Sequence, residues 1–190
     1  MYHEIEYYER NNDMIEIDDA GGGCFIGPEV LVIHRLETGT ARFLYIPPQV
    51  QERISYATEI LKAAFTEMGI TKAEPIQLCR GEIFDLFQKH LEEHGYQVLR
   101  QKVSSATDCL AEAEFMEVLY AHGLPRNISL HNRNYQELYE AVGFWYFSQN
   151  NQMVRRLRKI RLHPPFKIKN IVQKYPNLIR LLFEDQEVAG

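Results

Sequence analysis

The sequence predicts an α/β fold in which one mixed five-stranded β-sheet has helices on both faces. Three apolar runs near the N-terminus are joined by turn residues, which favours an antiparallel meander. Later apolar runs alternate with segments of helical periodicity, which is typical of parallel strands joined by right-handed crossovers. The 190 residues, 45% of them hydrophobic and 25% charged, suffice for one globular domain with an appendage.

The first three strands are predicted at residues 14–18, 30–36 and 41–46. A glycine-rich turn joins the first two runs, and residues 37–40 join the second to the third. Gly, Asp and Thr are favoured in such turns, because Gly adopts positive φ and short polar side chains bond to the turn backbone. We therefore expect three antiparallel strands, which end before the Pro-Pro pair at residues 47–48.

The central part of the chain is predicted to alternate helices with short strands. Apolar residues recur at helical spacing in three segments, each followed by a glycine, and two short apolar runs lie between them. The expected helices are 49–68, 82–94 and a third that begins within 104–108 and ends near His122, and the expected strands are 75–79 and 96–103. Residues 1–125 thus form the predicted α/β domain.

After Pro125 the pattern changes to helices alone. Helical segments are expected at about 135–149, 151–162 and 168–183. We therefore predict that residues 126–190 form a helical, basic extension packed on the α/β domain.

Positive charge is concentrated in this extension. Residues 1–150 carry a net charge of −11, whereas residues 151–190 carry +6. Within the extension, five cations fall in seven residues: Arg155, Arg156, Arg158, Lys159 and Arg161. Two interpretations fit this pattern, an arm that contacts nucleic-acid phosphates and a basic helix docked on the acidic body.

Two adjacent carboxylates, Asp18 and Asp19, end the first apolar strand and are followed by Gly21, Gly22 and Gly23. Paired carboxylates at the end of a buried strand are costly unless a cation or hydrogen bonds hold them. Oxygen ligands of this kind suit Mg²⁺ or Mn²⁺, and glycines allow a bulky ligand to approach. An ordinary hairpin turn is the alternative interpretation, because Asp and Gly are common turn residues.

The run Ile-Asp-Asp-Ala-Gly-Gly-Gly at residues 17–23, followed by Gly-Pro at 27–28, resembles the first-strand motif of type 2 ribonucleases H. The order of predicted strands and helices likewise resembles the ribonuclease H-like fold. The resemblance implies that Asp18 is the central metal ligand and that Asp19 is the counterpart of that family's Glu. It also implies that the glycines lie against nucleic acid, and Gly22 stands where that family has a basic residue.

The middle of the chain loosely resembles bacterial Holliday-junction resolvases at Glu82 and at Asp108, which opens an Ala-rich stretch. Enzymes of this fold hold two divalent ions with three or four carboxylates. The implied catalytic set is therefore Asp18, Asp19, Glu82 and Asp108, and Glu112 is a further candidate ligand on the helix face of Asp108. As alternatives, Glu82 and Asp108 are acids that stabilise helix N-termini, and Glu112 is a solvated surface residue.

These observations favour a nuclease that uses Mg²⁺ or Mn²⁺ at a two-metal site to hydrolyse phosphodiester bonds in structured or hybrid nucleic acid (DNA, RNA or both). A non-catalytic nucleic-acid-binding or assembly module with the same fold is the alternative. A nucleotide-binding glycine turn is disfavoured, because the acidic pair repels phosphate unless a metal intervenes. No apolar run approaches the roughly 20 residues of a membrane-spanning helix. Three widely spaced cysteines and an acidic N-terminus lead us to expect a cytoplasmic protein.

Overall fold

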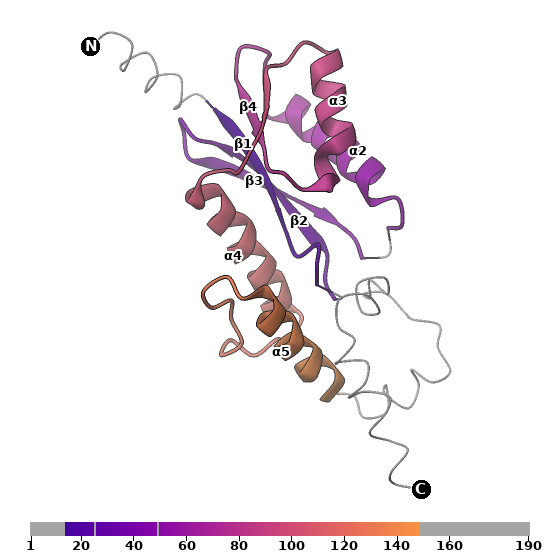
Figure 1. Ribbon diagram of the computed structural model, residues 1–190, viewed down its shortest axis with the longest axis vertical. Coiled ribbons are helices and arrows are strands. Elements are labelled where there is room, and N and C mark those ends of the chain that lie inside the picture. The colour runs from indigo at the N-terminus through magenta and orange to yellow at the C-terminus, as the bar shows by residue number, and fades with distance from the viewer. Residues whose placement is uncertain (1–13, 25, 49, 149–190) are drawn as a thin grey trace, which may run out of the picture. The chain divides into compact units, whose positions relative to one another are not determined.

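The computed structural model describes residues 14–24, 26–48 and 50–148 of the chain (Figure 1). The strands are β1 (Ile15–Ala20), β2 (Glu29–Arg35), β3 (Thr40–Ile46), β4 (Ile76–Leu78) and β5 (Val98–Arg100). The helices are α2 (Arg53–Glu67), the 3-10 turn η1 (Glu82–Phe84), α3 (Asp85–Glu93), α4 (Ser105–Ala121) and α5 (Tyr135–Ser148). Among these described helices, none is both long enough and apolar enough to cross a membrane.

All five strands join one sheet in the order β3-β2-β1-β4-β5. The pairs β1–β2 and β2–β3 are antiparallel, whereas β1–β4 and β4–β5 are parallel. On the central strand, Ile17 lies opposite Ile33 of β2 and Leu78 of β4. This arrangement confirms the predicted mixed sheet of the ribonuclease H-like fold, with three antiparallel strands followed by two parallel ones.

The described chain divides into two compact units. The larger contains the whole sheet, α2, α3 and the part of α4 that ends at Phe115. The smaller contains residues 23–24, 26–28 and 47–48 and the described chain from Met116, which includes α5. The predicted domain boundary at residue 125 stays a prediction. The helices predicted beyond residue 150 lie outside the described residues.

One face of the sheet carries the main hydrophobic core, which α2 and α3 cover (Figure 1). Ile15 and Ile17 of β1 are fully buried there, and the rings of Phe65 and Phe87 meet edge to face at 5.0 Å. Successive side chains of a strand point to opposite faces, so the residues between these isoleucines face the other side. Glu16 on β1 therefore lies on the face that α4 covers.

The first half of α4 lies along β1 on this second face. Near its start, Thr107 bonds to Glu16, and eight residues later Phe115 packs over Gly21. Gly21 has φ +78°, and a Cβ added to it would lie 2.3 Å from the Phe115 ring. The glycine after β1 thus allows both the turn and the close approach of α4.

The observed elements differ from the sequence prediction mainly at their ends. β1 continues to Ala20, because Asp19 and Ala20 pair with β2. The two carboxylates therefore lie within the strand, and the prediction that Asp18 ends it was wrong. The helix predicted at 82–94 begins as the 3-10 turn η1, and β5 pairs over only three residues.

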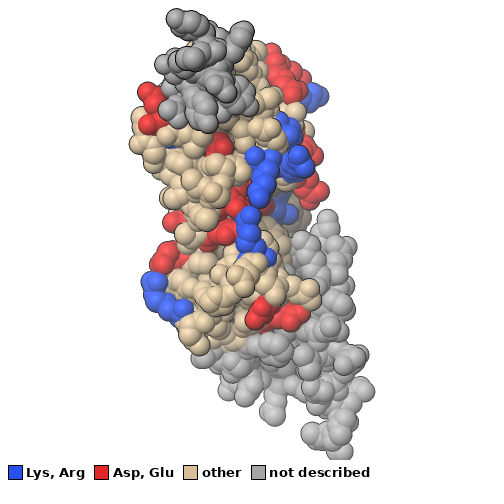
Figure 2. All heavy atoms as spheres, turned by 60° about the vertical axis from the view of Figure 1, so that its left-hand side comes forward, with Lys and Arg blue, Asp and Glu red and all other residues tan. Residues whose placement is uncertain are grey.

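The described surface carries both signs of charge. In the space-filling view, Lys and Arg side chains form a narrow band that is bordered by acidic side chains (Figure 2). The acidic excess of residues 1–150 is therefore interrupted by local basic strips rather than spread evenly over this face.

Candidate metal site

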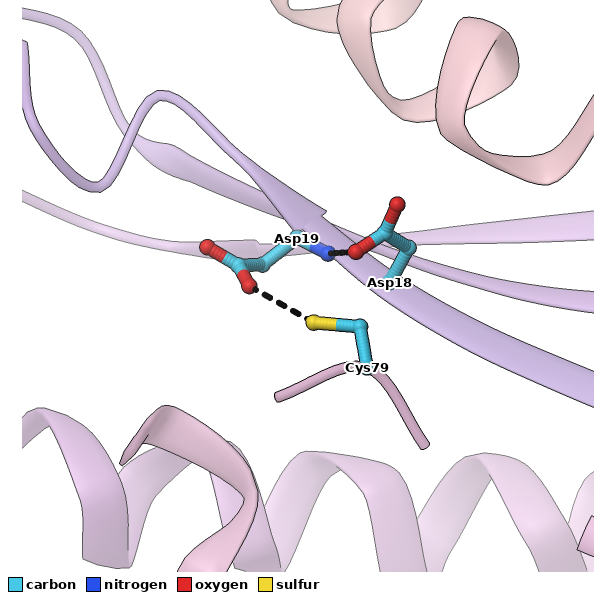
Figure 3. Close-up of side chains that lie close together, drawn as sticks. All are labelled: Asp18, Asp19 and Cys79. Atoms are coloured by element: carbon cyan, nitrogen blue, oxygen red, sulfur yellow. Dashed lines mark hydrogen bonds between the residues drawn. The ribbon is translucent and has the colours of Figure 1, made fainter. Parts of the chain in front are cut away.

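β1 brings two carboxylates and a thiol together at the centre of the sheet. Asp18 and Asp19 leave β1 in opposite directions, and the Cys79 thiol points towards Asp19 (Figure 3). The parallel register pairs Ile17 with Leu78, so Cys79 directly follows β4 beside Asp18. One ligand atom from each of the three residues lies within 4.8 Å of the others.

Hydrogen bonds fix the three side chains. The Cys79 Sγ–H donates to Asp19 Oδ1 at 3.3 Å, and the Asp19 amide donates to Asp18 Oδ1 at 2.9 Å. The Gly81 amide donates to Cys79 Sγ at 3.4 Å, and the Cys79 amide donates to the Ile17 carbonyl at 2.9 Å. The site is therefore built from the backbone of two neighbouring parallel strands.

The environment of the cluster disfavours negative charge. Burial, together with the charges of Glu29 and Asp18, raises the pKa of Asp19 to about 6. Burial and the two aspartates also raise the pKa of the Cys79 thiol, so that this group is protonated at neutral pH. Asp18 is only 6% exposed, and no Lys or Arg of the described residues forms an ion pair with it.

A partly buried ion pair lies next to the cluster. Arg53, the first residue of α2, donates from Nε to Glu29 Oε2 at 2.8 Å, and its Nη2 also contacts that oxygen. Glu29 is 2% exposed. A Cβ on Gly22 would lie 2.6 Å from Glu29 Oε1, so the turn passes against this pair only because residue 22 lacks a side chain. The positive charge of Arg53 is thus largely neutralised by its ion pair with Glu29.

The predicted ligand Glu82 opens η1 and is exposed. It is not part of the three-residue group formed by the described residues. Its neighbour Gly81 comes close to the cluster instead, since a Cβ there would lie 2.7 Å from Asp19 Oδ1. The segment 79–82 therefore contacts the site with Cys79 and Gly81, which both lie against Asp19.

Asp108 and Glu112 are half-buried on α4. On the same helix, Glu114 accepts a hydrogen bond from Tyr45 of β3 and so marks the flank of α4 nearest β3. Each helical residue turns about 100°, which puts Asp108 and Glu112 roughly a third of a turn or more away from Glu114. They therefore lie on the side of α4 away from Tyr45, and they are outside the three-residue group formed by the described residues.

The described residues fit a divalent cation. A buried Asp18 without a cationic partner, next to the half-buried Asp19, is the arrangement that a bound cation stabilises. Their oxygens suit Mg²⁺ or Mn²⁺, whereas the Cys79 sulfur suits softer ions. The five basic residues predicted to contact nucleic acid, residues 155–161, lie outside the described residues.

Sequence reasoning missed Cys79, Glu29 and Arg53. Cys79 is the last residue of the strand predicted at 75–79, and this position at the end of a parallel strand was the available signal. The nearness of Glu29 and Arg53 depends on how β2 and α2 pack, which residue spacing does not reveal.

No family model and no curated protein matches the chain. Among solved structures, it is similar to a chain of the simian T-cell lymphotropic virus intasome in complex with PP2A regulatory subunit B56 gamma, with 16% identity and a TM-score of 0.42 over 70% of this chain. It spans about half of that chain, with 48% covered. It is also similar to the catalytic core domain of BIV integrase, with 9% identity and a TM-score of 0.38, covering 74% of this chain and 85% of that one. The fold assignment rests on the strand order of the sheet rather than on these similarities.

Proposed function

We propose that this protein is a divalent-metal-dependent nuclease that hydrolyses phosphodiester bonds in structured or hybrid nucleic acid. The observation that carries the proposal is the adjacent pair Asp18 and Asp19 on the central strand, where Asp18 is buried and has no cationic partner among the described residues. Such a pair is stabilised by a bound cation. The ribonuclease H-like strand order and the first-strand motif favour phosphodiester chemistry over other uses of that cation.

The residues of this chain have separate roles in the proposal. Asp18 and Asp19 would hold Mg²⁺ or Mn²⁺, and Asp108 and Glu112 on α4 would add carboxylates. Cys79 orients Asp19 through its hydrogen bond. Two divalent ions held there would activate a water molecule and stabilise the leaving oxygen of the phosphodiester. The substrate class, a hybrid as for type 2 ribonucleases H or a junction as for the resolvases, is part of the proposal.

The test compares the full chain with its Asp18→Asn variant. We expect Mn²⁺ to bind the wild type in a calorimetric titration and binding to be lost in Asp18→Asn. Glu93→Gln, which removes an exposed carboxylate at the end of α3, is the matched control and should bind as the wild type does. Labelled single strands, RNA–DNA hybrids and four-way junctions then report metal-dependent cleavage. An Asp18→Asn protein that cleaves as fast as wild type would overturn the proposal.

A second candidate is a non-catalytic nucleic-acid-binding module with the same fold. One observation favours it, namely that the residue directly after β4, beside Asp18, is a protonated thiol rather than a carboxylate. Nucleic-acid binding that is unchanged by chelator, without cleavage in Mg²⁺ or Mn²⁺, would support this candidate over the nuclease.

A further inference from the structure

We propose that the cluster of Asp18, Asp19 and Cys79 is also a binding site for thiophilic divalent cations of the Zn²⁺ and Cd²⁺ class, with the Cys79 sulfur as a direct ligand. Such an ion would occupy the place of Mg²⁺ or Mn²⁺ and inhibit cleavage. The binding site stands on the geometry alone. Only the inhibition rests on the proposed nuclease function.

The spacing of the three side chains fits one small cation. Zinc binds sulfur at about 2.3 Å and carboxylate oxygen at about 2.0–2.2 Å, so two ligand atoms on one tetrahedral ion lie roughly 3–4 Å apart. Cys79 Sγ and Asp19 Oδ1 are 3.3 Å apart, and all three ligand atoms lie within 4.8 Å. One oxygen of each aspartate and the Cys79 sulfur are therefore close enough to bind the same small cation.

An independent observation is the charge at this place. Asp18 is more than nine-tenths buried and forms no ion pair with the described Lys and Arg residues. Arg53, whose charge acts on Asp19, is bound to Glu29. A divalent ion would supply the missing positive charge. On binding, the proton of Cys79 leaves to solvent and the sulfur becomes a thiolate ligand, so the charge on the protein ligands balances the ion more closely.

The identity of the third ligand sets the metal preference. Mg²⁺ requires oxygen ligands in near-octahedral geometry, whereas thiolate sulfur favours Zn²⁺ and related ions. A site with two carboxylates and one thiolate should therefore bind Cd²⁺ and Zn²⁺ more tightly than Mg²⁺. Bound in this way, the two aspartates are no longer available to the ions that the nuclease requires.

Cd²⁺ titration of the full chain tests the proposal directly, because cadmium bonded to thiolate gives an ultraviolet charge-transfer band. We expect one equivalent of Cd²⁺ to produce the band in the wild type. Cys79→Ser should lose the band and bind Cd²⁺ at least roughly tenfold more weakly. Cys24→Ser and Cys109→Ser are matched controls and should keep the band, since neither thiol is part of the cluster.

The variants separate the two proposals. Cys79→Ser keeps both aspartates and a hydroxyl that can donate to Asp19, and urea unfolding beside the wild type shows that the variant is folded. A band that persists in Cys79→Ser, disappears in Cys109→Ser or is missing from the wild type would overturn the soft-metal site. If the band depends on Cys79 and Asp18 while no substrate is ever cleaved, the soft-metal site stands and the nuclease proposal fails.

Discussion

At the scale of single residues, Asp19 makes stability depend on pH. Its pKa is about 6 in the folded protein, against 3.8 for an unperturbed aspartate side chain. The folded state therefore holds the proton to higher pH than the unfolded state does. The free energy of unfolding falls as pH rises from about 4 to about 6 and stays lowered above that, with no such loss below pH 4.

The asparagine of an Asp19→Asn variant carries no charge, so the unfolding free energy of this variant should not fall as pH rises from about 4 to about 6. In chelator, we expect the variant to gain on the order of 2 kcal/mol over wild type near pH 7 and nothing near pH 4. Urea unfolding at the two pH values measures the difference. Saturating Mn²⁺ should reverse the order of stability, because only the wild type binds the ion fully. Equal stability of the two proteins at both pH values would contradict this account.

Arg80 is the exposed cation that follows Cys79, and the described residues give it no ion-pair partner. This position suits contact with a phosphate near the metal site. We expect Arg80→Ala to weaken nucleic-acid binding and to reduce the salt slope by about one. Lys72→Ala, an exposed cation before the opposite end of β4, is the control and should change neither. If both variants lower the affinity and the salt slope equally, the effect comes from the loss of any positive charge, and Arg80 has no specific phosphate contact.

The sequence alone predicts part of this site. The adjacent Asp18 and Asp19 at the end of an apolar run were sufficient to indicate a buried acidic pair, because charge at that place is unusual. Cys79 could not be joined to them from spacing, since 60 residues separate it from Asp19 and only the parallel register of β1 and β4 brings them together. The loose match at Glu82 fell on the segment that follows β4, on an exposed side chain, and its role stays a prediction.

At the scale of elements, a buried polar network joins the start of α4 to the sheet. Glu16 accepts hydrogen bonds from the Ser104 amide at 3.0 Å and from the Ser104 and Thr107 hydroxyls. The single hydroxyl hydrogen of Thr107 goes to Glu16, so His34 Nδ1, at 2.8 Å, is the donor to Thr107 Oγ1. These bonds fix the place of Asp108, the next residue of α4, relative to β1.

Thr107→Val keeps the shape of this side chain but removes both bonds. Because Glu16 and His34 are buried and each loses a partner, we expect a loss of roughly 1–3 kcal/mol of unfolding free energy. Thr107→Ser retains the hydroxyl and should lose much less. Urea unfolding measures stability, and Mn²⁺ titration shows whether the placement of Asp108 matters for binding. A valine variant as stable as the serine variant would contradict the role of the network.

The turn after β1 depends on Gly21 for two reasons, the positive φ and the contact with Phe115. Gly39 has a similar φ of +67°, but a Cβ added there would have nothing within 4 Å. A substitution at Gly39 therefore measures the cost of the backbone conformation without the cost of a contact. We expect Gly39→Ala to cost about 1 kcal/mol of unfolding free energy and Gly21→Ala clearly more, because the Phe115 ring must move as well. Thermal or urea unfolding compares them. Equal losses of unfolding free energy in the two variants would mean that the Phe115 ring moves aside at no cost.

Element boundaries show what periodicity can and cannot predict. Helical spacing of apolar residues located α2, α3 and α4 within a few residues. The end of β1 was placed too early, because hydrogen bonding to β2 extends the strand through polar residues. The pattern of apolar residues in the sequence indicates which residues are buried. The length of a strand depends instead on its backbone hydrogen bonds to the neighbouring strand.

At the scale of the whole molecule, strand order determines where chemistry can occur. β1 is central, so its carboxylates have β4 on one side and β2 on the other, with α2 and α4 on the two faces. Alternation of strands and helices predicts this order, because right-handed crossovers leave few ways to add parallel strands. The convergence of Asp18, Asp19 and Cys79 follows from that order and not from any local motif.

The charge asymmetry of the chain leads to the last prediction. Five substitutions to Gln, at Arg155, Arg156, Arg158, Lys159 and Arg161, remove the concentrated charge of the extension while leaving the metal site intact. If these cations contact phosphates, as we expect, nucleic-acid affinity falls and the salt slope decreases by up to about 4, while Mn²⁺ binding is unchanged. If they dock on the acidic body instead, unfolding free energy falls and the salt slope is unchanged. Fluorescence anisotropy across a salt series and urea unfolding of the same variant distinguish phosphate contact from docking on the body. Cations that contact phosphates release counterions when nucleic acid binds, whereas an intramolecular contact does not change the number of counterions released.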